Sequence, residues 1–338
     1  MTSSTITRRQ ALAGIASLAG SALVPRLGHA ADAPVTLRLG LNNGPSHFMA
    51  KGAQKFGELA AAKSGGTVTI RVFPGGQLGG ERDMAEGVKV GTLDAAILSA
   101  GVLANFDPFV GIYELPFLFD DYPQAFRAQD GPVFEETSRR LQASSGMRLL
   151  GFFDNGFRYV FTRSKTLRSI NDFKGVKIRV PEAPSYVKTF EQLGASPTVV
   201  PFPELYTALQ TGLVEGYEGN PASNLEQKFF EVTKFIAPTK HLFLSAAVIL
   251  SERKFQSLTP AQRDAVLAAF KEALVYEREI GSRLEDGRAL DVLTKEKGLT
   301  LTPIDTKPIK QAVRPVLEWY AERIGPEGMR WIERLTAT

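Results

Sequence analysis

The sequence has 338 residues, an ordinary globular composition and a formal net charge of +4. Hydrophobic residues make up 43% and charged residues 22%, which excludes intrinsic disorder as the main state. The chain has no cysteine, which excludes disulfide scaffolds, thiolate metal sites and cysteine nucleophiles. Because only three histidines are present, we expect neither a metal nor a cofactor. The length predicts about two domains.

The first thirty residues have the pattern of an export signal. Arg8 and Arg9 precede a run of small apolar residues over positions 11–24, which is too short to span a bilayer. The pattern predicts a signal peptide over residues 1–30, with cleavage after Ala30. The adjacent arginines resemble a twin-arginine signal, and an ordinary secretory signal is the alternative. Export without cysteine indicates a bacterial periplasm.

Removal of this segment changes the interpretation of the charge. It takes away three arginines and no acidic residue, so 37 basic and 36 acidic side chains remain. The mature chain therefore has a net charge of +1, and nucleic-acid binding loses its support. No later segment is apolar enough for a membrane span. We expect no nucleic-acid partner and a monomeric protein.

Strand and helix patterns alternate along the mature chain, which predicts an α/β fold. Alternation of apolar and polar residues, or a short apolar run, predicts strands over 35–40, 68–73, 95–99, 149–153, 157–162, 176–180 and 198–200. Apolar residues at helical spacing predict helices over 46–63, 81–87, 186–193 and 204–211. Ser46 is the expected cap of the first helix.

The longest helix is predicted from Pro260 to about Lys297. Thr259 as cap and Pro260 in the first turn mark its start. At 1.5 Å per residue, a helix of this length reaches roughly 57 Å. That length exceeds one small domain, so we expect the helix to pack along two.

Motifs for catalysis are missing from the sequence. It has no GxSxG, HExxH, P-loop or GxGxxG pattern, and the glycine-rich segment 75–80 fits a turn. After signal removal only His47 and His241 remain. A capping or surface role is the simpler interpretation of His47. An enzyme is therefore disfavoured, although folding can still assemble a pair of carboxylates.

Two predicted strands each carry an arginine opposite an apolar face. Arg158 projects away from the aromatic residues of segment 156–162, because side chains alternate along a strand. Arg179 likewise lies opposite the apolar face of segment 176–181. A guanidinium matches a carboxylate in shape and charge, so two of them in a cleft define an organic-anion site. The alternative is that both are solvated surface arginines.

Five motifs resemble those of the DctP-type substrate-binding proteins of TRAP (tripartite ATP-independent periplasmic) transporters. They are VFPGGQLGGE at 72–81, GTLD at 91–94, ELPFLF at 114–119, DFKGVKIRVP at 172–181 and ELYTALQTGLVEG at 204–216. In this order they span most of the mature chain. The resemblance implies a two-lobed periplasmic-binding-protein fold of type II-like architecture. It also implies a hinged central cleft and a long helix packing along both lobes.

The resemblance also implies where the chain divides. We assign residues 31–155 plus about 244–283 to lobe I, and 156–243 plus about 284–338 to lobe II. A receptor of this kind contains no ATP site, and the sequence has none.

Individual site residues are implied by the same resemblance. Arg179 clamps the ligand carboxylate and Arg158 joins it. Asn220 contacts the ligand, whereas Glu218 orients an arginine. Ser99 stands where sialic-acid-binding members carry a glutamate, which argues against sialic acid. The further expected contacts at the cleft are Asn43, His47, Phe202 and Tyr206.

Together these observations predict a periplasmic receptor that binds a small organic acid and delivers it to a TRAP-type membrane permease. Two alternatives remain open: a periplasmic lyase or hydrolase acting on organic acids, and an accessory protein that senses the acid. The sequence does not decide among hydroxy acids, dicarboxylates, sugar acids and aromatic acids.

Overall fold

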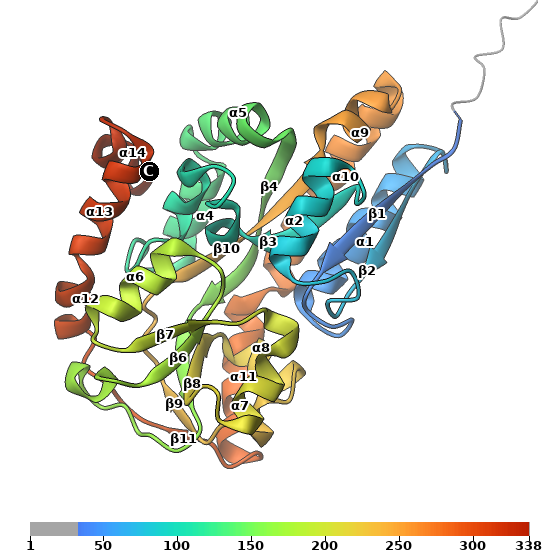
Figure 1. Ribbon diagram of the computed structural model, residues 1–338. Helices are drawn as coiled ribbons and strands as arrows, with labels where there is room; N and C mark the ends of the chain where they lie inside the picture. The colour runs from blue at the N-terminus through green and yellow to red at the C-terminus, as the bar shows by residue number, and fades with distance from the viewer. Residues whose placement is uncertain (1–32, 338) are drawn as a thin grey trace, which may run out of the picture. The chain divides into compact units, whose positions relative to one another are not determined.

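Two β-sheets surrounded by helices build the protein (Figure 1). The structure is a computed structural model that describes residues 33–337, so the predicted signal peptide lies outside the described residues. From Pro34 onward these residues form one compact unit. None of the described helices combines the length and apolarity that a membrane span requires.

The first sheet has five strands in the order β2-β1-β3-β10-β4. Its strands are β1 (Val35–Leu41), β2 (Val68–Phe73), β3 (Ala95–Ser99), β4 (Met147–Phe157) and β10 (Phe243–Ser251). β1 runs parallel to β2 and β3, whereas β10 pairs antiparallel with β3 and β4. Its helices are α1 (Phe48–Lys63), α2 (Glu81–Val90), α3 (Ala100–Leu103), α4 (Tyr122–Asp130), α5 (Val133–Ser145) and α9 (Glu252–Ser257).

The second sheet has six strands in the order β11-β9-β5-β8-β6-β7. Its strands are β5 (Tyr159–Thr162), β6 (Lys177–Val180), β7 (Ser196–Val199), β8 (Gly216–Gly219), β9 (Phe235–Ala237) and β11 (Thr300–Leu301). β6 lies parallel to β7 and β8, and β5 pairs antiparallel with β8 and β9. Its helices are α6 (Pro184–Gln192), α7 (Leu205–Thr211) and α8 (Pro221–Glu226).

The chain passes from one sheet to the other at Arg158. The predicted continuous strand over 157–162 is wrong, because β4 ends at Phe157 in the first sheet and β5 begins at Tyr159 in the second. The Arg158 N–H donates to the Leu242 carbonyl (2.8 Å), which joins this crossing to the return crossing before β10. Phe157 and Tyr159, which the sequence pattern placed in one strand, therefore belong to two different sheets.

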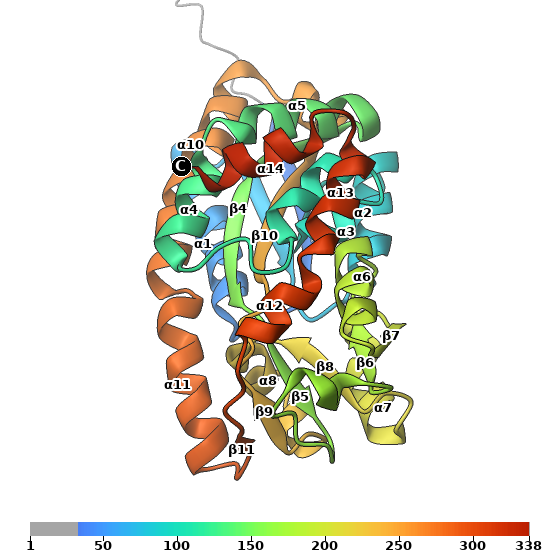
Figure 2. The same cartoon turned by 90° about the vertical axis from the view of Figure 1, so that its left-hand side faces the viewer.

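The long helical segment accompanies both sheets, as predicted, but it consists of two helices. α10 (Pro260–Ile280) starts with the predicted Thr259 cap and packs against α1 and β4. Gly281 is extended, and α11 (Ser282–Lys295) continues beside α8 (Figure 2). The predicted long helix along both sheets is confirmed, with one interruption where the backbone of Gly281 leaves the helical conformation.

The C-terminal helices reach elements of both sheets. They are α12 (Lys307–Val313), α13 (Pro315–Ile324) and α14 (Gly328–Thr336). α12 and α13 contact α6, whereas α14 contacts α4 and α5. The lobe boundaries drawn from the sequence stay a prediction.

The start of α1 differs from the prediction. The cap is His47 and not Ser46: the His47 Nδ1 accepts a hydrogen bond from the Met49 N–H (3.3 Å). The ring takes this place because His47 is buried (3% exposed), whereas Ser46 faces solvent.

Candidate functional site

A small polar cavity lies between the two sheets. Its volume is about 30 Å³. Its polar lining residues are Asn42, Asn43, Glu81, Ser99, Asn155, Arg158, Arg179 and Ser223. Most of them follow the carboxyl ends of parallel strands in one sheet or the other. Such edges are where ligands bind in open α/β sheets.

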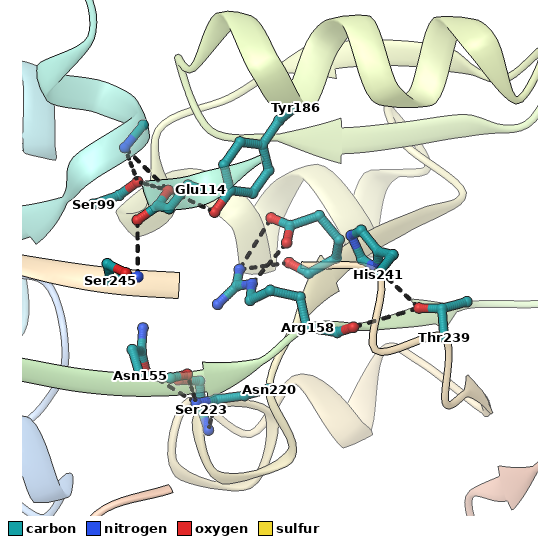
Figure 3. A network of polar contacts seen from close by, with 12 residues as sticks. Ser99, Glu114, Asn155, Arg158, Tyr186, Asn220, Ser223, Thr239, His241 and Ser245 are labelled. Atoms are coloured by element: carbon teal, nitrogen blue, oxygen red, sulfur yellow. Dashed lines mark hydrogen bonds and ion pairs between the residues drawn. The ribbon is translucent and has the colours of Figure 1, made fainter. Parts of the chain in front are cut away.

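Arg158 carries a charge that the protein itself compensates. Its Nε donates to Glu218 Oε2 (2.7 Å), and its Nη2 donates to Glu218 Oε1 (3.0 Å) and to the Glu218 carbonyl (2.9 Å). Figure 3 shows Arg158 at the centre of the polar network. Burial lowers the pKa of Arg158, but the Glu218 carboxylate raises it further, so the net direction is upward. The same pairing lowers the pKa of Glu218 against its burial. Both groups are therefore ionised.

Arg179 carries a charge that no carboxylate pairs with. Its Nε donates to the Val200 carbonyl (2.7 Å), and its guanidinium lies 5.8 Å from the ring centre of Phe202. Within residues 33–337 its two terminal nitrogens donate to no protein acceptor. Burial lowers its pKa to about 10, and the Arg158 charge acts in the same direction, whereas the Glu218 and Glu81 carboxylates oppose the shift. The side chain is 3% exposed and stays protonated at neutral pH.

Glu81 lies at the start of α2 and faces the same cavity. Its Oε1 accepts from the Ser99 N–H (2.9 Å). Burial raises its pKa, although the Ser99 hydrogen bond and the charges of Arg179 and Arg158 oppose this shift. Glu81 forms no ion pair among the described residues, although its charge and that of Arg179 attract each other across the cavity.

Asn220 does not line the cavity but holds a residue that does. Its Nδ2 donates to the carbonyl (2.7 Å) and side-chain oxygen (2.9 Å) of Asn155, and its Oδ1 caps α8 through the Ser223 N–H (2.8 Å). The amide of Asn220 is thus used by the protein, and Asn155 takes its place at the cavity wall (Figure 3).

The side chains of Asn43 and His47 both contact the hydroxyl of Ser223, which lies beside the second sheet. The Asn43 Nδ2 donates to Ser223 Oγ (3.3 Å), and the His47 Nε2 lies 3.2 Å from it. Because the His47 Nδ1 accepts from a backbone N–H, the proton is assigned to Nε2. Burial lowers the pKa of His47 to about 3, so the ring is neutral. Asn43 lines the central cavity, whereas His47 lines a separate crevice of about 370 Å³ beside α8 and α11.

Ser99 lines the cavity with its hydroxyl already engaged. It donates to Glu114 Oε2 (2.6 Å), which also accepts from the Tyr186 hydroxyl (2.8 Å). The other Glu114 oxygen accepts from the Ser245 N–H (3.1 Å), as Figure 3 shows. Burial raises the pKa of Glu114 to about 7, although these hydrogen bonds oppose the shift.

The two predicted aromatic contacts separate in space. Phe202 lines the cavity beside Arg179. Tyr206 lies one turn further along and donates its hydroxyl to Glu231 Oε2 (2.7 Å), outside the lining of the cavity. The structure therefore brings together Arg158, Arg179, Asn43, Ser99 and Phe202, and leaves Tyr206 apart.

Sequence reasoning missed six lining residues: Asn42, Glu81, Asn155, Pro181, Ser223 and Leu244. Asn42 is the most informative, because both polar atoms of its buried side chain lack a hydrogen-bond partner among the described residues. Such groups are rare and call for an explanation. A signal was available, since Asn42 directly follows a predicted strand, at the edge where ligands bind.

The DctP model of bacterial extracellular solute-binding proteins, family 7, matches residues 39–323. The chain is 31% identical over 342 residues to the C4-dicarboxylate-binding periplasmic protein DctP of Rhodobacter capsulatus, covering 98% of this chain and 99% of that protein. It therefore belongs to this family of non-enzymatic periplasmic solute-binding proteins.

Solved structures share the fold. A TRAP periplasmic solute-binding protein from Polaromonas sp. JS666, bound to D-erythronate, superposes with a TM-score of 0.85 at 30% identity, covering 90% of this chain and 99% of that one. A second from Roseobacter denitrificans, with bound β-D-glucuronate, gives 0.85 at 29% identity, covering 90% and 100%. The predicted two-lobed periplasmic-binding-protein fold is confirmed.

Proposed function

We propose that this protein is a periplasmic receptor for a small organic acid, whose carboxylate binds Arg179. The observation that carries the proposal is the buried guanidinium of Arg179, which lines the cavity without an ion pair among the described residues. A buried charge is costly unless it is paired. An anionic ligand supplies the missing partner, and the planar guanidinium can bind its carboxylate through two hydrogen bonds.

Charge balance favours a ligand with one negative charge. Arg158 is neutralised by Glu218 at 2.7 Å, which leaves the charge of Arg179 for the ligand. A second carboxylate on the ligand would lie near the carboxylates of Glu81 and Glu218. Among the described residues, no further cation without a partner lines the cavity to offset that repulsion. Arg158 then orients the ligand and adds to the positive electrostatic potential of the cavity. The amides of Asn42, Asn43 and Asn155 can form hydrogen bonds with ligand oxygens.

The remaining predicted residues receive supporting roles in this proposal. Glu218 orients Arg158, Asn220 positions Asn155, and His47 holds Ser223. Ser99 lines the cavity through a hydroxyl fixed by Glu114. Tyr206 has no part in binding.

The two sheets are the cores of two lobes that close over the ligand. The chain crosses between them at Arg158, before β10 and at Gly281, and these crossings are the proposed hinges. The exclusion of water on closure strengthens every charge-assisted contact, because the local dielectric falls. The closed form delivers the acid to a TRAP-type membrane permease, after export by a twin-arginine signal and cleavage at Ala30.

Replacement of Arg179 tests the carboxylate site. We expect Arg179→Met to weaken binding of the preferred acid at least about tenfold, because a charge-assisted contact is worth about 1.5–3 kcal/mol. Isothermal titration calorimetry with D-erythronate, D-glucuronate, lactate and succinate gives the affinities. The relatives that bind D-erythronate, β-D-glucuronate and C4-dicarboxylates guide this choice of ligands.

Arg139→Met is the matched control, since Arg139 lies on α5 with its side chain 68% exposed. It should bind like the wild type. Equal affinity of Arg179→Met and the wild type for the preferred acid would show that the carboxylate lies elsewhere.

A further inference from the structure

We propose that the end of the ligand remote from its carboxylate lies in a second, apolar chamber at the mouth of the site. The substrate class is then a monocarboxylic acid that is polar next to the carboxylate and apolar at its far end. Val199, Val102 and Phe202 determine the length and polarity of that end. This inference rests on the proposed carboxylate site at Arg179.

The second chamber adjoins the central cavity. It has a volume of about 140 Å³. The two share Glu81, Arg179, Pro181 and Phe202 as lining residues. Arg179 therefore borders both, and a carboxylate on it can direct the rest of the ligand into either one.

Volume decides between the two directions. The central cavity of about 30 Å³ is much smaller than the chamber of about 140 Å³. The carboxylate end of an acid of four or more carbons fits beside Arg179, and the rest of the acid needs the larger space. The larger crevice of about 370 Å³ is lined by neither arginine, and the contacts of Ser223 with Asn43 and His47 lie between it and the cavity.

The chamber offers an apolar surface. Val102, Val199, Pro201 and Phe202 line it together with Pro181. Val199 is 46% exposed, and a ligand in the chamber covers it.

The polar side chains of the chamber are engaged by protein partners. Arg82 pairs with Glu182 across the mouth (2.6 Å), and Asp83 accepts from the Gly80 N–H (2.9 Å). An apolar group at the far end of the ligand meets the valine, proline and phenylalanine side chains of the chamber, and its burial is favourable.

Two acids of equal length separate the possibilities. Calorimetry compares 2-hydroxyhexanoate, which is apolar at its far end, with gluconate, which is hydroxylated throughout. We expect 2-hydroxyhexanoate to bind at least about tenfold more tightly. Gluconate binding as tightly or more tightly overturns the proposal.

Val199→Phe tests the place of the far end, because it fills an exposed part of the chamber without entering the core. We expect it to weaken the binding of 2-hydroxyhexanoate at least about tenfold. The affinity for lactate, which is too short to reach the chamber, should stay within about twofold of the wild-type value. Val199→Ser should weaken the longer acid alone, by loss of apolar contact. Val275→Phe, 59% exposed on α10, is the control and should change neither affinity.

The carboxylate site and the apolar chamber are tested separately by these variants. If Val199→Phe weakens the binding of 2-hydroxyhexanoate and of lactate equally, or of neither, the chamber does not hold the far end of the ligand. If Arg179→Met still abolishes binding in that case, the carboxylate receptor stands and only the chamber is wrong. If no acid binds the wild type, the receptor function and the chamber fall together.

Discussion

Arg158 and Arg179 face the same cavity and differ in whether the protein supplies a counter-charge. Arg158 has the carboxylate of Glu218 at 2.7 Å, so its charge is satisfied in the folded protein. Arg179 donates to one backbone carbonyl and faces the cavity with the rest of its guanidinium. A ligand anion therefore gains most from Arg179, while Arg158 is kept in place by its own partner.

The side-chain amide of Asn42 lines the cavity and has no hydrogen-bond partner among the described residues. Replacement by leucine removes two buried polar atoms that make no hydrogen bond among the described residues. We expect Asn42→Leu to leave the unliganded protein as stable as the wild type or about 1 kcal/mol more stable, because an unsatisfied buried amide is costly. Ligand affinity should fall about tenfold, since the amide serves the ligand.

Thermal unfolding with and without the preferred acid measures both effects of Asn42→Leu. Asn171→Leu, at an exposed position, is the control for binding. A variant that loses stability without ligand would show that the wild-type amide already has a partner.

At the scale of elements, the junction of α10 and α11 holds a cluster of buried carboxyl groups. Asp154 accepts from the N–H and hydroxyl of Ser282 (2.9 and 2.7 Å), and so caps α11. Glu277 accepts from the Asp154 N–H (2.9 Å), and its other oxygen has no partner among the described residues. Burial raises the pKa of Asp154 to about 6 and that of Glu277 well above its ordinary value. Asp286 on α11 is raised in the same way.

These shifts predict that stability falls as pH rises. A carboxyl with a raised pKa in the folded state favours folding when it is protonated, and that contribution is lost as pH passes from the unfolded toward the folded pKa. Glu277→Gln keeps the neutral form at every pH. We therefore expect its stability relative to the wild type to increase by up to about 1.4 kcal/mol per pH unit above pH 5.

Urea unfolding at pH 5, 6 and 7 measures this difference. Glu279→Gln, two residues along on the exposed side of α10, should keep the wild-type pH dependence. Identical slopes for Glu277→Gln and the wild type would mean that Glu277 is ionised in the folded protein.

At the scale of the whole molecule, a few polar contacts join the helices of one sheet to those of the other. The Tyr186 hydroxyl on α6 donates to Glu114 Oε2 (2.8 Å), which lies in the 3₁₀ helix η1 (Pro108–Glu114) beside the first sheet. Gly101 allows this approach, since a Cβ there would lie 3.1 Å from the Tyr186 ring and 2.7 Å from Glu114. This bond forms only when the proposed lobes are together.

Tyr186→Phe should therefore favour separation of the lobes. We expect ligand affinity to fall about tenfold, because closure loses a hydrogen bond to a carboxylate. Calorimetry gives the affinity, and small-angle X-ray scattering without ligand should give a larger radius of gyration. Tyr206→Phe is a matched control, because its lost bond to Glu231 (2.7 Å) lies within elements of the second sheet. Equal behaviour of both variants would exclude Tyr186 from closure.

Local sequence patterns were sufficient to predict most of the helices and strands. A short apolar run placed β3 at its observed bounds, and Thr259 with Pro260 marked the start of α10. These signals succeed because strand patterns and helix caps depend on neighbours in the chain. The same patterns did not reveal the breaks at Arg158 and Gly281, where the chain passes from one sheet to the other. The alternation of apolar and polar residues is the same whichever sheet a residue packs against.

The sequence by itself determined the α/β class, the export signal as an expectation, and the family through five ordered motifs. It also identified Arg158 and Arg179 as residues on the polar face of their segments, with burial left open. Only the tertiary structure decided that both are buried, that Glu218 compensates one alone, and that Asn155 and Asn42 line the cavity. The physical reason is that compensation and burial depend on residues 60 or more positions apart, which no local pattern relates.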